Sequence, residues 1–283
     1  MKLPLFAFLI SFLFLSSQAQ ESDFPYTLTL MWETAPVLKT VESVIFDPKS
    51  GFIYTANIHG HFMAKDGNGF LSKLALDGSV VEEQWVKGLD APTGLGIYQG
   101  KLYTTDIDKI VEIDISSGTI LHTYPVSGAK AFNDVAIGPD GTVYCSDTGG
   151  DQVFSLTNGT LHLFAKDIPT PNGIIVQKDG LLLTRWNPKD VVFLDFSRQN
   201  TKVHVQGIQG PDGLEQMEDG SYLLSSFHGV VYHVSKDGDK TRLLDTRQAG
   251  IKAADIDYIA AKKWLLVPTM DTHKVMAYQL VKK

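Results

Sequence analysis

Apolar and polar side chains alternate along most of this chain in short runs, which are separated by glycine, asparagine and aspartate. β-Branched and aromatic residues are concentrated in these runs, for example over residues 109–115 and 230–235. A period of two between turn-forming residues is typical of strands with one buried face. No stretch keeps the three-to-four-residue spacing of an amphipathic helix, so the pattern predicts an all-β protein.

Three segments of the chain repeat one arrangement: a polar residue, a short strand, a glycine-containing turn and a second strand. The polar residues that open these segments are Asn133, Asn172 and Asp212. The aspartates of the three turns are Asp140, Asp179 and Asp219. Both series have separations of 39 and 40 residues, and two registers held in phase indicate a structural repeat.

Weaker copies of the same segment surround Glu42, Thr93 and Asp255, which brings the number of units to six. Two further strand candidates lie between successive hairpins. Four strands in a unit of roughly 40 to 45 residues form the blade of a β-propeller. We therefore expect a six-bladed β-propeller with four-stranded antiparallel blades.

The last unit has only three strand candidates, over residues 255–261, 263–269 and 274–281. The N-terminal part of the chain has a spare candidate, Tyr26 to Thr34, before the first inner strand. We expect this N-terminal strand to complete the last blade, because the pairing would remove an open sheet edge and tie down both ends of the ring.

The first 19 residues have the pattern of a secretory signal peptide. Lys2 supplies the positive start, residues 3–15 form an apolar run, and Ser17 and Ala19 fit the small-residue pattern of a cleavage site. The run is shorter than the about 20 apolar residues of a membrane helix. We expect cleavage after Ala19, a single propeller domain over residues 20–283, and a secreted or periplasmic protein without membrane association.

The net charge of −7, without a basic stripe, argues against a nucleic-acid partner, because nucleic-acid binding depends on clustered Lys and Arg. The one cysteine, Cys145, lies within a predicted strand, where we expect a packed thiol rather than a nucleophile. We expect a monomer or weak oligomer whose partner is a small-molecule substrate.

Ring closure should bring the polar residues at the starts of the six inner strands to one mouth of the central channel. These residues are Glu42, Thr93, Asn133, Asp134, Asn172, Asp212 and Asp255. The second strand of each blade runs back, so its end should reach the same mouth. The residues expected there are Asn57 to His61, Asp106, Asp147, Trp186, His228 and Asp271.

Glu42, Asn172 and Asp212 offer only oxygen ligands, the type that calcium and other hard cations prefer. Two carboxylates buried close together without a cation would repel each other and lose their hydration. Asn-Gly and Asp-Gly pairs are also good turn formers, but the hairpin turns lie seven residues further along. We expect a divalent metal at these three residues, calcium in the first place, with magnesium, manganese or zinc as alternatives.

The chain resembles the gluconolactonase/regucalcin (senescence marker protein) family of calcium-dependent phosphotriesterase-like propellers. The resemblance covers residues 20–283 and rests on a glutamate in the first inner strand, followed by FND, PNG and PDG, one in each of three later blades. It implies that Glu42, Asn172 and Asp212 bind the metal, and that Asn133 is a substrate contact or an extra ligand. The chain departs from the family at Ala131, where gluconolactonases place an arginine that grips the sugar acid.

The resemblance implies a metal-dependent hydrolase that acts on a lactone or a related ester. In such an enzyme Asp212 either activates a water molecule or attacks directly, and Asn133 orients the substrate oxygen. The predicted walls of the substrate pocket are His59, Asp134, Trp186 and His228. The alternative is a non-enzymatic propeller that is stabilised by a metal and binds a small ligand or sugar, because a fold does not determine a function.

Overall fold

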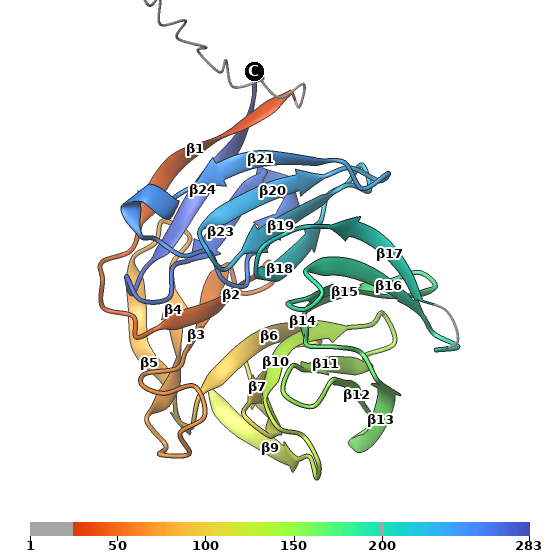
Figure 1. Ribbon diagram of the computed structural model, residues 1–283. Coiled ribbons are helices and arrows are strands. Elements are labelled where there is room, and N and C mark those ends of the chain that lie inside the picture. Colours follow the sequence, from red (N-terminus) through yellow and green to blue (C-terminus); the bar gives the residue numbers. More distant parts are fainter. Residues whose placement is uncertain (1–24, 199–200) are drawn as a thin grey trace, which may run out of the picture.

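A computed structural model describes residues 25–198 and 201–283 of the chain (Figure 1). Within these residues, 24 strands form six four-stranded antiparallel sheets around a central axis. Two 3₁₀ turns, η1 (Arg247–Ala249) and η2 (Ala260–Lys262), are the helical elements of the described part, and it contains no helix long and apolar enough to cross a membrane. The predicted six-bladed all-β propeller is confirmed, whereas the predicted signal peptide over residues 1–19 lies outside the described residues.

Each blade is one sheet, and its strands follow the chain from the centre outward in all blades but the last. Blade 1 consists of β2 (Val41–Asp47), β3 (Phe52–Asn57), β4 (Gly69–Leu74) and β5 (Val80–Leu89). Blade 2 consists of β6 (Pro92–Tyr98), β7 (Lys101–Asp106), β8 (Lys109–Asp114) and β9 (Thr119–Pro125). Blade 3 consists of β10 (Phe132–Ile137), β11 (Val143–Asp147), β12 (Gln152–Thr157) and β13 (Thr160–Lys166).

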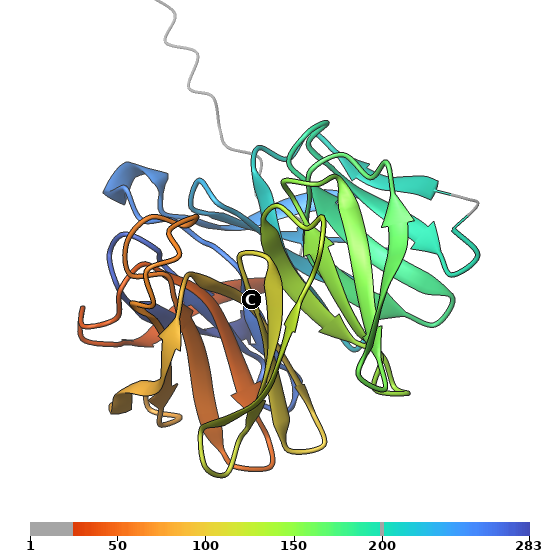
Figure 2. The same cartoon turned by 90° about the horizontal axis from the view of Figure 1, so that it is seen from below.

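The remaining three blades complete the ring. Blade 4 consists of β14 (Pro171–Gln177), β15 (Gly180–Arg185), β16 (Asp190–Asp195) and β17 (Thr201–Gln206). Blade 5 consists of β18 (Pro211–Gln216), β19 (Tyr222–Ser226), β20 (Val230–Val234) and β21 (Lys240–Asp245). Blade 6 consists of β22 (Asp257–Ile259), β23 (Trp264–Pro268), β24 (Val275–Lys282) and β1 (Tyr26–Glu33). Figure 2 shows the ring turned by 90°, with strands running from one face to the other.

The predicted closure of the ring is confirmed in blade 6. Strand β1 pairs antiparallel with β24, from Tyr26 opposite Lys282 to Glu33 opposite Met276. At the centre of the ring, the hydroxyl of Ser43 donates a hydrogen bond of 2.6 Å to the carboxylate of Asp255. The N-terminal strand thus completes the sheet of blade 6, and blades 1 and 6 are also joined at their inner strands.

The hydrophobic core lies between the blades rather than within one compact centre. Six clusters of buried side chains each fill the space between two neighbouring blades. Cys145 is fully buried in the cluster between blades 2 and 3, as expected for a packed thiol. Because every blade contacts two neighbours, the position of each inner strand depends on the whole ring.

Inner strands approach each other most closely at glycines that follow the polar residues of the repeat. A Cβ atom added to Gly94 would lie 2.5 Å from the Cα of Asp134, and one added to Gly213 would lie 2.5 Å from the backbone nitrogen of Ile256. At Gly173 the added atom would collide with the backbone carbonyl of Asp212. These glycines therefore permit close packing around the channel.

Candidate active site

The inner strands of five blades are irregular at the positions that the repeat marks with polar residues. The pairing register shifts between Phe132 and Val135 in β10, and at the matching positions of β2, β6, β14 and β18. A bulge of this kind interrupts the ladder and redirects a side chain, and bulges are common beside active sites. Here the redirected positions include Glu42, Asn133, Asn172 and Asp212.

These side chains meet at the floor of a cavity of about 340 Å³ at one mouth of the channel. Its polar lining residues are Glu42, Thr93, Asn133, Thr148, Asn172 and Asp212. Its wall is mainly hydrophobic and includes Ile58, Phe62, Met63, Ile107, Phe227 and Met270. The structure thus brings the three predicted metal ligands, Asn133 and Trp186 into one pocket, which is large enough for a small molecule.

Several oxygen atoms at this floor are buried without a hydrogen-bond partner. Within residues 25–198 and 201–283, Oε2 of Glu42, Oδ1 of Asp212 and Oδ1 of Asn133 all lack one. A buried polar atom that has lost water and gained no partner costs roughly 1–3 kcal/mol, and more when it is charged. Three such acceptors from three blades are what a cation with oxygen ligands would satisfy.

Electrostatic repulsion adds to this cost. Burial, followed by the neighbouring carboxylates of Asp212, Asp255 and Asp134, raises the pKa of Glu42 well above its usual value. Burial and the carboxylate of Asp255 likewise raise the pKa of Asp212. A divalent cation would reverse both effects, because an adjacent positive charge favours the ionised carboxylate.

The donor set fits a hard metal and does not fit a site made of histidine or cysteine. In the part of the chain that the structure describes, no three His, Cys, Asp or Glu side chains converge as a metal-binding group. The candidate site therefore depends on two carboxylates together with the carboxamides of Asn133 and Asn172, a combination that suits calcium or magnesium better than zinc.

Asp134 does not lie in this pocket, although the sequence places it beside Asn133. Consecutive side chains of a strand point to opposite sides, and Asp134 lines a second cavity of about 250 Å³ deeper in the channel. Its carboxylate accepts hydrogen bonds from the backbone nitrogens of Ile174, at 2.9 Å, and Val135, at 2.6 Å. Asp255, which we expected at the same mouth, lines the second cavity too.

The second cavity concentrates acidic groups. Asp134, Glu215, Asp255 and Asp257 all line it. Burial is the main cause that raises the pKa of Asp134 to about 7, against hydrogen bonds from Ile174 and Val135 that lower it. Burial, followed by the neighbouring carboxylate of Asp134, raises the pKa of Asp255 well above its usual value.

The two histidines predicted for the pocket wall lie outside the lining. His59 is exposed; its Nδ1 lies 3.2 Å from the carbonyl oxygen of Asn68. His228 is also exposed, and its ring centroid is 6.3 Å from that of Trp186, which does line the pocket. His59 itself has a left-handed φ of +49°, and His228 lies in the turn after β19, so the direction of neither side chain can be derived from strand alternation.

Two aspartates that the sequence predicted at the rim of the channel, Asp106 and Asp147, have a structural role. Asp106 is fully buried, accepts hydrogen bonds from the backbone nitrogens of Asp90 and Ala91, and pairs with Lys109 at 3.2 Å. Asp147 accepts hydrogen bonds from the matching nitrogens one blade later. These carboxylates fix the loop that leads into the inner strand of their own blade.

In blades 1 to 5, the residue that follows the last residue of the second strand lines the pocket. Most of these residues were not predicted from the sequence. Those that follow the second strands are Ile58, Ile107, Thr148, Trp186 and Phe227, and Met270 lies two residues after β23. One lining residue per blade at a fixed point is a periodic signal. It could have been found by continuing each repeat one residue beyond its strand.

Comparison with known proteins identifies the fold. No protein-family model and no curated protein matches the sequence. A solved structure assigned as a gluconolactonase superposes with a TM-score of 0.67 at 16% identity, over 91% of this chain and 93% of the other. A streptogramin B lyase gives a TM-score of 0.66 at 11% identity, over 90% of this chain and 98% of its own.

The virginiamycin B lyase of Staphylococcus aureus gives a TM-score of 0.61 at 15% identity, over 90% of this chain and 100% of its own. The fold is that of gluconolactonase-like six-bladed propellers. At these identities the likeness extends to the fold alone, so the chemistry has to be argued from the site.

Proposed function

We propose that this protein is an exported, metal-dependent hydrolase of the gluconolactonase-like type that cleaves a lactone or a related ester. The metal is a divalent cation, calcium in the first place, held by Glu42, Asn172 and Asp212. The observation that carries the proposal is the group of unpaired buried oxygens at the floor of a hydrophobic pocket. Such a site combines a charged centre with a concave, largely dry wall.

The bound cation would supply Lewis-acid polarisation of a carbonyl group. Glu42 and Asn172 are buried and would serve as ligands. One carboxylate oxygen of Asp212, Oδ1, accepts no hydrogen bond from any described residue. It would take a proton from a water molecule at this oxygen, or attack the carbonyl carbon with it.

Asn133 would position the substrate. Its backbone oxygen is held by the hydroxyls of Thr93, at 2.7 Å, and Thr105, at 2.6 Å. This fixed backbone leaves the carboxamide at the floor, where it can orient the substrate oxygen. The apolar wall would exclude bulk water from the reaction.

The test is a panel of lactones, aryl esters and phosphotriesters, incubated with purified protein and calcium, magnesium, manganese or zinc. We expect metal-dependent turnover by the wild type and at least a hundredfold loss in Asp212→Asn, while Asp106→Asn, a buried carboxylate outside the pocket, retains turnover when folded. The mass of the product separates hydrolysis, which adds a water molecule, from elimination, which adds none. Elemental analysis identifies the bound ion.

A metal-stabilised binding protein is the second candidate, favoured by the acidic groups of the channel, which a cation would neutralise without any reaction. Bound metal together with an inert substrate panel would support it over the hydrolase. Export is tested separately by expressing the full chain and determining the N-terminus of the released protein, which we expect to be Gln20.

A further inference from the structure

The pocket above the floor is hydrophobic to a degree that a polyhydroxylated substrate would not match. Its wall is built from Ile58, Phe62, Met63, Ile107, Phe227 and Met270. Glu42 and Asp212 are the only charged side chains of the described chain that line it, and both are acidic. Apart from the cation proposed at the floor, an anionic substrate would thus meet no positively charged group in the lining, and sugar hydroxyls pressed against these six apolar side chains would lose water without gaining hydrogen bonds.

Two wall residues occupy a backbone conformation that costs free energy. Ile107 has a φ of +59° and Met270 a φ of +52°. The left-handed region is unfavourable for ordinary side chains and most unusual for a β-branched one. Strain of this kind is often retained at ligand sites, because the surrounding structure maintains it. At both positions the strained backbone presents an apolar side chain to the pocket.

Two more wall residues are exposed to solvent. Phe62 is 58% exposed and Met63 is 38% exposed, and both lie in the loop between β3 and β4. Single exposed apolar residues are common, but these two continue an apolar surface that already lines a cavity. A hydrophobic ligand in the pocket would cover them.

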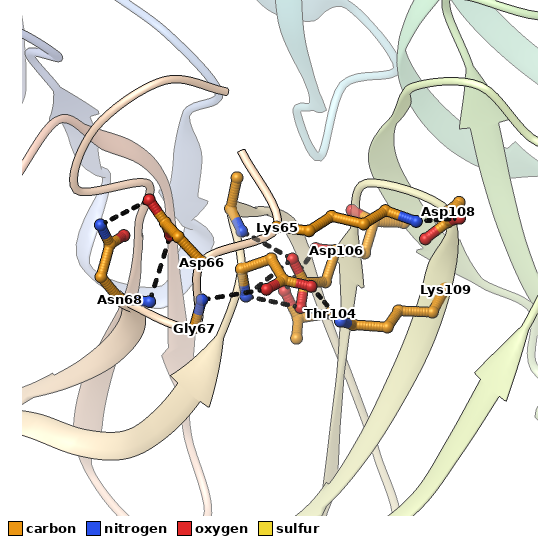
Figure 3. Close-up of polar contacts among 11 residues, drawn as sticks. Lys65, Asp66, Gly67, Asn68, Thr104, Asp106, Asp108 and Lys109 are labelled. Atoms are coloured by element: carbon orange, nitrogen blue, oxygen red, sulfur yellow. Dashed lines mark hydrogen bonds and ion pairs between the residues drawn. The ribbon is translucent and has the colours of Figure 1, made fainter. Parts of the chain in front are cut away.

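The loop that carries Phe62 and Met63 is attached to blade 2 (Figure 3). Nζ of Lys65 lies 2.5 Å from Oδ2 of Asp108, and the backbone nitrogen of Gly67 donates a hydrogen bond of 3.1 Å to Asp90. Within the loop, the carboxamide of Asn68 donates to Asp66 at 2.9 Å. These contacts restrain the loop before a ligand binds, which reduces the entropy cost of binding.

We propose that the pocket accepts a neutral lactone or ester with a hydrophobic substituent, and that Phe62 and Met63 set this preference. The inference rests on the proposed function for the reaction itself, but the choice of ligand depends only on the wall. The substituent lies against the wall while the carbonyl group faces Asn133 and Asp212 at the floor.

The kinetic test uses γ-lactones with unbranched side chains of increasing length, together with a δ-lactone that carries free hydroxyls on the ring carbons C2, C3 and C4. We expect kcat/KM to rise about fourfold for each added methylene that the wall covers. The hydroxylated lactone should be at least a hundredfold poorer than the longest γ-lactone. In the double variant Phe62→Ser/Met63→Ser, the dependence on chain length should be largely lost.

Leu121→Ser is the matched control, because Leu121 is a 41% exposed apolar residue on β9 that does not line the pocket. It should leave the chain-length dependence unchanged. Both variants change exposed side chains, and equal melting temperatures would verify that they fold like the wild type.

A binding experiment separates this inference from the proposed function. γ-Lactams with the same side chains resist hydrolysis, and their binding to metal-free protein can be followed by displacement of N-phenyl-1-naphthylamine, a neutral fluorescent dye. Affinity that increases with chain length in the wild type but not in Phe62→Ser/Met63→Ser supports the inference, even if no lactone is hydrolysed. Turnover that favours the hydroxylated lactone, or affinity independent of chain length, would overturn it.

Discussion

Removal of one predicted ligand tests the metal site most directly, because the metal and the carboxylates have opposite effects on stability. A cation that binds only the folded protein stabilises it by about 2.7 kcal/mol at a concentration one hundred times its dissociation constant. For a domain of this size, each kcal/mol raises the melting temperature by about 2–4 °C. Calcium should therefore raise the melting temperature of the wild type by about 5–11 °C relative to chelator.

In Glu42→Gln the calcium-induced shift should disappear, since the variant loses a charged ligand from the floor of the pocket. Without metal, the same variant should melt at or above the temperature of the metal-free wild type. The reason is that Oε2 of Glu42 is buried and unpaired beside the carboxylate of Asp212. Removing the charge thus relieves both its desolvation and the repulsion.

The assay is scanning calorimetry at pH 7.5 in chelator and in a calcium series. Asp106→Asn is the matched control, because Asp106 is also buried but its carboxylate oxygens are paired with backbone nitrogens and Lys109. It should lower stability in both conditions and keep the calcium shift. A full calcium shift in Glu42→Gln would refute the ligand assignment.

Four further outcomes are expected. In chelator the wild type should melt at a higher temperature at pH 5 than at pH 8. Burial raises the pKa of Asp134 from 3.8 to about 7, so the stability linked to its proton is lost as pH rises through 7. A melting temperature that stays constant or rises with pH would contradict this. Gly173→Ala should lower the free energy of unfolding by roughly 1–3 kcal/mol in denaturant titrations, because the new methyl group collides with the next blade. Cys145, fully buried and with a raised pKa, should react with a thiol reagent only in denaturant; rapid reaction of the native protein would contradict its packing. Leu28→Asp should lower the melting temperature, because Leu28 packs against the core of blades 5 and 6 where β1 closes the ring. Thr29→Asp, on the exposed side of β1, should leave the melting temperature unchanged, and equal values for the two variants would count against this role of β1.

The architecture could be predicted from the sequence because three blades repeat the same hairpin turn at nearly equal spacing and the other three contain weaker copies of the same segment. The N-terminal strand of the last blade followed from counting, since the last unit was one strand short and the chain before Glu42 had one to spare. Both predictions use only the order of elements along the chain, which is why they needed no knowledge of side-chain direction.

The site was predicted less completely, for local reasons. The meeting of Glu42, Asn172 and Asp212 at one floor followed from ring closure, and their binding of a metal stays a prediction. Asp134 was misplaced because a bulge and strand alternation turn it away from Asn133. Phe62 and Met63 could not be located, because their position depends on contacts between a loop and the neighbouring blade.

The pairing of β1 with β24 also determines when the site can form during folding. Tyr26 lies opposite Lys282, and the backbone nitrogen of Asp255 holds the carbonyl oxygen of Glu42. Such long-range contacts form late, since distant parts of the chain must first be brought together. An ion bound at Glu42 is consequently expected to lower the unfolding rate while leaving the refolding rate nearly unchanged. It would thus increase the kinetic stability of the closed ring.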